Sequence, residues 1–595
     1  MAEGTGLLHR PELAMLPSAL PTLEDEVADQ RSPVDRLMHA WMGRATGGLS
    51  PASLIAAYHD WLAHLRIAPG KQQLLVEKAL RKSLRLAVHA GACLAGKLPP
   101  DARCIEPLPQ DRRFDSPAWR QFPFNLIHQS FLLTQQWWHV ATTDVAGVSR
   151  HHEDVVSFTA RQLLDIVSPS NFIWTNPELL AATQASGGRN LVQGAMNLAE
   201  DWARTVLGQP PVGTEAFQVG RDVAVTPGRV VFRNRLIELI QYEPQTESVH
   251  PEPILIVPAW IMKYYILDLS PANSLVRWLV ERGHTVFVVS WKNPDAGDRD
   301  LGMDDYLRLG IFAALDAVHA IVPDAGVHTA GYCLGGTLLA IALAALARRE
   351  QNRVRSMTML AAQTDFTDAG ELTLFIDESQ VTFLEDIMWH QGYLDTRQMA
   401  GAFTLLRSND LIWSRLVHDY LMGGRTKMTD LMAWNADATR MPYRMHSEYL
   451  RRLFLNDDLA EGRYTVDGEA VALSDIRVPI FAVGTERDHV APWRSVYKIH
   501  LQTDAEITFL LTQGGHNAGI VSEPANNKRR YRVAARAQGA PFLDPDTWMD
   551  RAVPHEGSWW TTWGEWLAAR SGPLGKLPLL GHSFGPAPGR YVHVR

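Results

Sequence analysis

The chain has 595 residues, a formal net charge of −8, and hydrophobic and charged contents of 46% and 21%. This composition is that of an ordinary soluble protein with more than one domain, and the mild acidity argues against non-specific binding of nucleic acid. Three cysteines are too few for a disulfide framework, and the apolar runs fall short of the ~20 residues of a membrane helix, so we expect a cytoplasmic protein without a transmembrane segment.

The first third of the chain is predicted to be helical. Residues 1–32 combine acidic side chains with three prolines and are expected to form a flexible arm. Residues 33–213 follow helical periodicity. Within them, Ser50 followed by Pro51 is typical of a helix start, with a capping side chain and a proline at the first position. We therefore predict an all-helical N-terminal domain over residues 33–213.

The pattern changes after residue 213. A predicted hairpin at 229–244 is followed by short apolar runs that alternate with helical segments, which is typical of a mostly parallel sheet. The predicted strands are 253–258, 285–291, 327–331, 356–362, 478–484 and 507–512. We predict an α/β catalytic domain over 214–595. The helical interval 363–477 breaks the alternation and is predicted to be an inserted lid, although a fixed helical layer would give the same pattern.

The most informative stretch joins the strand at 327–331 to an Ala/Leu-rich helix. Residues 331–335 read Gly-Tyr-Cys-Leu-Gly, which is the strand–turn–helix pattern of an α/β-hydrolase nucleophile with Cys333 in place of serine. The flanking glycines are needed because strand and helix would otherwise collide. We predict that Cys333 is the nucleophile and that the Leu334 N–H, at the helix N-terminus, stabilises an oxyanion.

An acid and a base follow in the chain order that this fold uses. The loop after 478–484 contains Glu486, Asp488 and His489, and the loop after 507–512 contains His516. We assign Asp488 as the residue that orients His516, with Glu486 as the competing acid. His516 is the predicted base, because His489 directly follows the acid and its side chain would tend to diverge from it.

The remaining predictions concern the oxyanion and the chemistry of sulfur. The turn after the first parallel strand should supply a second oxyanion donor, the N–H of Ala259 or Trp260. A plain turn that enters a helix is the alternative.

A thiol that attacks a thioester exchanges one thioester for another, and the resulting acyl-cysteine stays activated toward a hydroxyl. Cysteine at this position therefore favours acyl transfer over hydrolysis.

These motifs together resemble the single-subunit, class I polyhydroxyalkanoate synthases. The segments that carry the resemblance extend through both halves of the chain: 111–119, 168–178, 263–271, 290–294, 331–336, 407–414, 433–439, 488–493 and 514–516. The resemblance departs from the family pattern at a few positions. Pro258 is followed by Ala-Trp-Ile-Met, Lys292 replaces Arg, Ala433 replaces Phe, and Asn517 stands where Ile is common. These departures leave the length of the monomer open.

The resemblance implies polymerisation of (R)-3-hydroxyacyl-CoA with release of coenzyme A. Cys333 would be acylated and His516 would activate the 3-hydroxyl, with Asp488 orienting His516 or acting on the hydroxyl itself. It implies no metal or other cofactor, a homodimer, and a cytoplasmic location on the surface of polymer granules. Lys528, Arg529 and Arg530 are candidate contacts for the coenzyme A phosphates, although a solvated basic run is the simpler interpretation.

Two other classes of function remain open from the sequence. One is a cysteine-dependent esterase, thioesterase or polyester depolymerase, which a serine nucleophile would suit better. The other is a catalytically weak, granule-associated paralogue, which would not need the three residues Cys333, Asp488 and His516 in this order.

Overall fold

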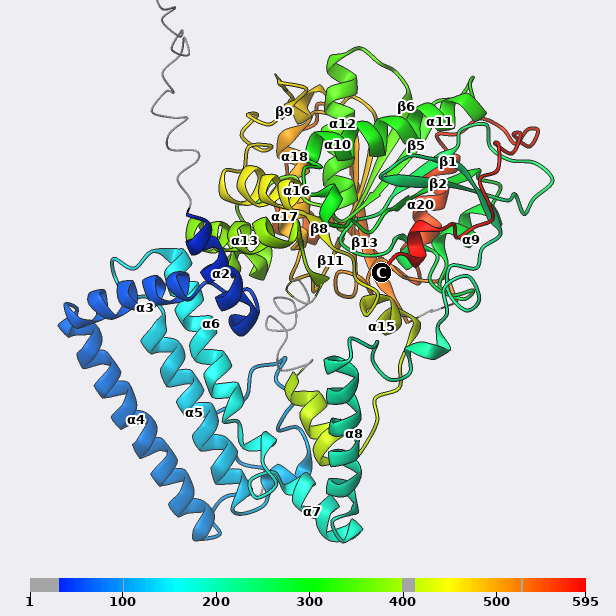
Figure 1. Cartoon of the computed structure of the whole chain (residues 1–595). Helices are drawn as coiled ribbons and strands as arrows, with labels where there is room; N and C mark the ends of the chain where they lie inside the picture. Colours follow the sequence, from blue (N-terminus) through cyan, green and yellow to red (C-terminus); the bar gives the residue numbers. More distant parts are fainter. Residues whose placement is uncertain (1–31, 100, 397, 399–411, 526–527) are drawn as a thin grey trace, which may run out of the picture.

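The computed structural model describes residues 32–595 except 100, 397, 399–411 and 526–527 (Figure 1). Residues 1–31 of the predicted arm and residues 407–411 of one family-like segment lie outside this description. No helix in the described ranges is long and apolar enough to cross a membrane.

The N-terminal half of the described chain is helical, as predicted. Ser50 Oγ accepts a hydrogen bond from the Ser53 N–H and Pro51 occupies the first helical position, so the predicted helix start is confirmed. The helices are α2 (Pro33–Thr46), α3 (Pro51–Arg66), α4 (Pro69–Leu94), α5 (Phe124–Thr142), α6 (Arg150–Ile166), α7 (Pro177–Ser186) and α8 (Arg189–Val206).

A ten-stranded sheet organises the second half, in the order β1-β2-β4-β3-β5-β6-β11-β12-β13-β14. Its strands are β1 (Gly228–Arg233), β2 (Ile237–Tyr242), β3 (Ile254–Val257), β4 (Val286–Trp291), β5 (Val327–Tyr332), β6 (Val354–Leu360), β11 (Ile480–Thr485), β12 (Ile507–Thr512), β13 (Arg530–Arg536) and β14 (Val553–Glu556). The six strands from β4 to β12 are parallel, and an antiparallel pair extends the sheet at each edge. The predicted hairpin and all six predicted strands are confirmed.

Helices cover both faces of the parallel strands, which is why those strands read as continuous apolar runs. Every residue of β3, β4, β5, β11 and β12 is buried. The helices of this half are α9 (Leu275–Val280), α10 (Met303–Asp305), α11 (Ala313–Ile321), α12 (Leu334–Arg348), α17 (Trp493–Tyr497), α18 (Ile499–Gln502), α19 (Pro545–Arg551) and α20 (Trp559–Ala568). The α/β-hydrolase fold with a preceding helical region is confirmed.

The tryptophans serve two different purposes. Trp559, Trp560 and Trp563 of α20 are buried against the sheet, and Trp563 Nε1 donates to Thr358 Oγ1 at 3.0 Å. In contrast, Trp174 and Trp202 of the N-terminal half are 81% and 68% exposed. The tryptophan content therefore reflects both core packing and an apolar surface.

The interval between β6 and β11 is mainly helical where it is described. It contains α13 (Glu378–Gln391), β7 (Tyr393–Leu394), α15 (Asp430–Asn435), β8 (Met441–Pro442), α16 (Tyr443–Glu448), and the hairpin of β9 (Thr465–Val466) and β10 (Glu469–Ala470). Figure 1 shows α13 beside α2, and His39 Nδ1 lies 2.7 Å from Asp386 Oδ2. The insertion is thus in contact with the N-terminal helices as well as with the sheet.

Candidate active site

Cys333 lies at the sharp turn between β5 and α12. Its φ angle is 53°, a left-handed conformation that costs energy for a residue with a Cβ atom. The Cys333 N–H donates to the Leu360 carbonyl at 2.9 Å, which fastens the turn to the end of β6. The residue is buried, with 8% of its surface exposed. The strained turn therefore holds the sulfur at the carboxyl end of the parallel sheet.

The glycines around Cys333 are required by close backbone contacts. A Cβ atom at Gly331 would lie 2.3 Å from Gly336 Cα, and one at Gly335 would lie 2.1 Å from the Val257 carbonyl oxygen. Both distances are far below van der Waals contact, so the steric reason given for the spacing is confirmed. Leu334 is the first residue of α12, and its N–H therefore has no acceptor within the helix.

Asp488 is held by four hydrogen bonds in the loop after β11. Its Oδ1 accepts from the N–H groups of Val490 and Ala491, both at 2.8 Å, and its Oδ2 accepts from Thr485 Oγ1 at 3.0 Å and lies 2.8 Å from His516 Nδ1. Burial raises the pKa of Asp488, but the charge of His516 and these hydrogen bonds outweigh it and lower the pKa below its ordinary value. Asp488 is therefore an anion that faces His516.

The two alternatives in the same loop are oriented differently. Glu486 and His489 are exposed, whereas Asp488 is buried. The His489 carbonyl oxygen accepts a hydrogen bond from the Glu371 N–H at 3.1 Å, so this part of the loop faces the segment after β6. The geometry favours Asp488 over Glu486 as the partner of His516.

His516 joins Asp488 and Cys333. It follows β12 through Gly514, whose φ angle of 127° favours glycine, and its Nδ1 lies 2.8 Å from Asp488 Oδ2, while Cys333 is near enough to affect its ionisation. Burial lowers the pKa of His516, but the charges of Asp488 and Cys333 and the two hydrogen bonds raise it well above its ordinary value. The structure thus brings the three predicted residues together as a buried acid–imidazole–thiol chain.

The predicted oxyanion turn after β3 packs against the same elbow. Ala259 and Trp260 are buried, and the preceding Val257 carbonyl is the group that Gly335 approaches. The Trp260 carbonyl accepts a hydrogen bond from Thr439 Oγ1 at 2.5 Å, so the insertion holds this turn. Either N–H is near the elbow, and the choice between them stays a prediction.

The basic run lies at the beginning of β13. Arg530 opens this strand, and Arg529 Nη1 donates to the carbonyl of Gln513, three residues before His516. Lys528 precedes them and is exposed. This arrangement places the run beside the loop that carries His516, and its role toward coenzyme A stays a prediction.

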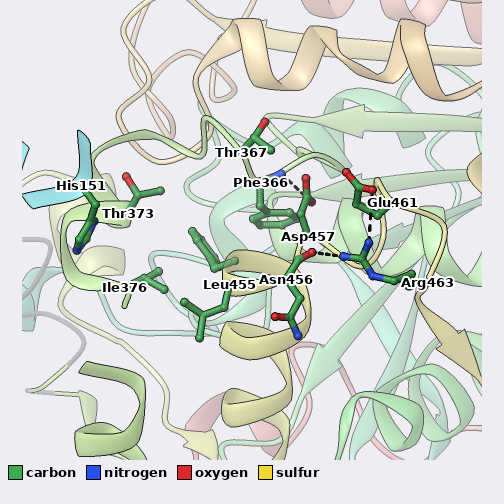
Figure 2. Close-up of a pocket in the computed structure, with 11 residues that line it drawn as sticks. His151, Phe366, Thr367, Thr373, Ile376, Leu455, Asn456, Asp457, Glu461 and Arg463 are labelled. Carbon is green, nitrogen blue, oxygen red and sulfur yellow. Dashed lines mark hydrogen bonds and ion pairs between the residues drawn. The ribbon is translucent and has the colours of Figure 1, made fainter. Parts of the chain in front are cut away.

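A cavity of about 600 Å³ lies between α6, the segment after β6 and the insertion (Figure 2). Phe366 and Phe454 line it, with ring centroids 4.9 Å apart, and Tyr449 packs against Phe454 at 5.3 Å. Burial and then the charge of Cys333 raise the pKa of Tyr449. Two rings of the aromatic cluster Phe366, Tyr449 and Phe454 therefore line the cavity, and Tyr449 packs against them.

Sequence reasoning missed the polar groups that support the site. Thr485 Oγ1 donates to Asp488, and Thr439 Oγ1 donates to the Trp260 carbonyl. Tyr332 OH donates to Asn517 Oδ1 at 2.5 Å. Only the two N–H groups that donate to Asp488 could be expected from the local sequence, since an aspartate side chain often accepts hydrogen bonds from the backbone two or three residues later in a turn. In the described ranges, no group of three or more His, Cys, Asp or Glu side chains is arranged to hold a metal ion.

Comparison with known proteins gives three family matches. The model described as "Poly-beta-hydroxybutyrate polymerase (PhaC) N-terminus" matches residues 110–279, and "Poly-beta-hydroxybutyrate polymerase N terminal" matches 29–71. The model described as "alpha/beta hydrolase fold" matches 252–523, which contains Cys333, Asp488 and His516.

Curated relatives cover most of the chain. A poly(3-hydroxyalkanoate) polymerase of Methylorubrum extorquens is 43% identical over 87% of this chain and 87% of its own length. The corresponding subunit of Rhizobium meliloti is 41% identical over 82% of this chain and 80% of its own. That of Cupriavidus necator is 37% identical over 93% of this chain and 94% of its own.

Proposed function

The chain belongs to the poly(3-hydroxyalkanoate) polymerase family, and from this premise we propose that it polymerises (R)-3-hydroxyacyl-CoA into a polyester with release of coenzyme A. The observation that carries the proposal is the buried chain of Cys333, His516 and Asp488 at the carboxyl end of the sheet. A cysteine paired with a cationic imidazole suits attack on a thioester, because the thiolate is the reactive form of the thiol.

In the first step, Cys333 Sγ attacks the thioester carbonyl carbon. The bond from this carbon to the sulfur of coenzyme A breaks, the acyl group is transferred to Cys333, and the leaving thiolate takes the proton of the His516 imidazolium. The raised pKa of His516 keeps this proton available at neutral pH. The Leu334 N–H and one N–H of the turn at Ala259 and Trp260 stabilise the tetrahedral oxyanion.

In the second step, the hydroxyl of another hydroxyacyl group attacks the acyl-cysteine. His516 takes the hydroxyl proton, the new ester bond forms, and the carbon–sulfur bond breaks to return the Cys333 thiolate beside an imidazolium. Asp488 supports both steps, because its buried carboxylate stabilises the charged imidazole and fixes its orientation through Nδ1.

The surroundings of the site suit the other parts of the proposal. Lys528, Arg529 and Arg530 lie beside the His516 loop, where cationic side chains would bind the phosphates of coenzyme A. The exposed apolar side chains of the N-terminal helices suit a polymer granule surface, and the proposal includes a homodimer at that surface in the cytoplasm.

One assay separates this function from hydrolysis and from a binding role. The full chain is incubated with (R)-3-hydroxybutyryl-CoA, and free thiol, free hydroxy acid and insoluble polyester are measured together. Thiol released with polyester supports the proposal. Thiol released with free acid indicates a thioesterase, and no product over a series of acyl lengths indicates a paralogue without activity. Charge reversal at Arg529 and Arg530 should raise KM for the acyl-CoA, and an unchanged KM would refute the phosphate contact.

A further inference from the structure

Asn517 forms a second link between the loop of the base, His516, and the strand that ends at the nucleophile, Cys333, in addition to the contacts of the reacting side chains. It directly follows His516, and its Oδ1 accepts the hydroxyl of Tyr332, which directly precedes Cys333. The two oxygen atoms are 2.5 Å apart, and the Tyr332 ring centroid lies 5.5 Å from that of His516. The chain neighbours of the two reacting side chains are therefore bonded to each other.

The direction of this hydrogen bond is fixed. Tyr332 is 2% exposed. Burial, together with the charges of Cys333 and Asp488, raises the pKa of its phenol well above the ordinary value. The hydroxyl therefore stays protonated and donates, and the amide of Asn517 must present its oxygen to Tyr332. Its Nδ2 then faces Asn435 Oδ1 at 3.3 Å, at the end of α15.

Helix α15 also holds the predicted oxyanion turn. Trp434 Nε1 donates to the Lys263 carbonyl at 2.8 Å, and Thr439, just after the helix, donates to the Trp260 carbonyl. Tyr265 OH donates to Asp437 Oδ2 at 2.8 Å. The segment from Trp434 to Thr439 is thus bonded to the turn on one side and, through Asn435, to Asn517 on the other.

The backbone of the His516 loop is fastened to the acid side of the site. The Gly514 carbonyl accepts from the Arg487 N–H at 2.9 Å, and the loop closes on itself through Gly519 N–H and the Gly515 carbonyl at 2.8 Å. These bonds fix the loop against Asp488, and neither of them reaches β5. The Tyr332–Asn517 hydrogen bond supplies that attachment.

We propose that Asn517 is a positioning residue that attaches the His516 loop to the end of β5 and so keeps His516 beside Cys333. The inference rests on the proposed function for its catalytic meaning. An aliphatic side chain at position 517 could not accept the Tyr332 hydroxyl, so the link depends on the amide of Asn517. Its loss should change the ionisation of the Cys333–His516 pair before it changes the fold.

The test compares N517L, Y332F and the double variant Y332F/N517L with the full wild-type chain. Alkylation of Cys333 by iodoacetamide is followed against pH, because a thiolate reacts and a thiol does not. We expect the alkylation midpoint to move to higher pH in each single variant, since a displaced imidazolium stabilises the thiolate less. In the polymerisation assay, kcat should fall about tenfold with little change in KM, which is a fraction of the about 10²–10⁴-fold that a general base contributes.

The double variant identifies the cause. If the hydrogen bond is what each single substitution removes, the double variant should lose no more than the worse single one. If the losses of kcat in the two single variants add up in the double variant, the proposal is overturned. It is also overturned if N517L keeps the wild-type alkylation midpoint and shows only a lower melting temperature. Asn435→Ala is the matched control, because it leaves the Tyr332–Asn517 bond intact and should keep the wild-type midpoint; a shifted midpoint in it would also overturn the proposal.

The alkylation readout does not need the substrate. A wild-type chain that makes no polyester would therefore refute the proposed function, while the midpoints of N517L and Y332F would still decide the role of Asn517.

Discussion

The sheet half and the helical half of this chain bury their apolar residues in very different ways. One large core cluster runs through the sheet half from Val223 to Val592. The helical half contains only small clusters among its described residues, and α4 presents a row of apolar side chains to solvent. Val76, Leu80, Leu84 and Val88 of this row are 60%, 67%, 66% and 64% exposed. The sheet half therefore buries its apolar residues in one continuous core, whereas the helical half carries a surface that is apolar in water.

The difference separates the two tasks of the proposed polymerase. The reacting groups are fixed by close backbone contacts and buried hydrogen bonds of the sheet half, where a shift of 1 Å would matter. The helical half is attached to the insertion by pairs such as His39–Asp386, and by His151 Nε2 with Asp377 Oδ2 at 3.4 Å. The exposed apolar row on α4 suits attachment to a granule surface and does not take part in catalysis.

Gly335→Ala should have the largest effect, because its Cβ would lie 2.1 Å from the Val257 carbonyl oxygen. We expect the free energy of unfolding to fall by about 3 kcal/mol and polymerisation to be lost. The matched change in the helical half is Gly91→Ala in α4, where a new Cβ meets open space and should raise the stability by about 0.5–1 kcal/mol. Urea unfolding of both variants measures this, and equal effects would remove the contrast between the halves.

Asp488→Asn should lower kcat by about 10²–10⁴ without unfolding the chain, because the charged imidazole loses its carboxylate. The charge of Asp488 raises the pKa of His516, so its removal lowers that pKa. The protonated imidazole that serves the leaving thiolate then disappears at a lower pH. The alkaline limb of the kcat/KM profile should move to lower pH, and a limb that stays in place would show that another acid serves coenzyme A.

Two leucines of α4 test the apolar surface within a single helix. Leu75 is 7% exposed and Leu84 is 66% exposed. We expect Leu75→Ala to cost about 2–3 kcal/mol of stability and Leu84→Ala less than about 0.5 kcal/mol. Thermal melts give both values. A large cost at Leu84 would mean that the row is covered in the protein as it exists in solution, for instance in a dimer.

Acid should weaken the sheet half through its buried histidines, with the smallest effect of this series. Burial lowers the pKa of His500 to about 3, and burial with the charges of His250 and His328 lowers that of His284 to about 3. In the unfolded chain these histidines have pKa values near the ordinary 6.5. Their neutral burial therefore contributes its full stability above pH 6.5, and this contribution falls as the pH drops toward 3.

His500→Gln should reduce this dependence of stability on pH, because one proton fewer is taken up on unfolding. The exposed His59 of α3 is the control, and His59→Gln should leave the dependence unchanged. Urea unfolding between pH 7 and pH 4 measures the slope. A slope that is the same in wild type and His500→Gln would contradict the assignment.

The sequence predicted the central strands and the triad for physical reasons. Strands buried on both faces form apolar runs, and the chain order of nucleophile, acid and base limits the choice to one loop for each residue. The sequence kept Glu486 as a competitor of Asp488, because the two lie in one loop and only burial in the folded chain separates them.

Other features had no local signal. Strand β13 lies next to the edge of the sheet and contains three arginines, so its pattern resembles a loop, and the sequence favours Arg530 as part of a basic run. Asn517 and Tyr332 are 185 residues apart in sequence, and no periodicity connects them. Such contacts depend on the tertiary fold, which the spacing of residues does not encode.

The proposed polymerisation depends on the acylation of Cys333. The most direct test is mass spectrometry of the full chain after rapid mixing with (R)-3-hydroxybutyryl-CoA and an acid quench, followed by peptide mapping. We expect added hydroxyacyl mass on the peptide that contains Cys333, and none in Cys333→Ala at unchanged melting temperature. Acyl mass on a different residue, or polyester made by Cys333→Ala, would contradict it.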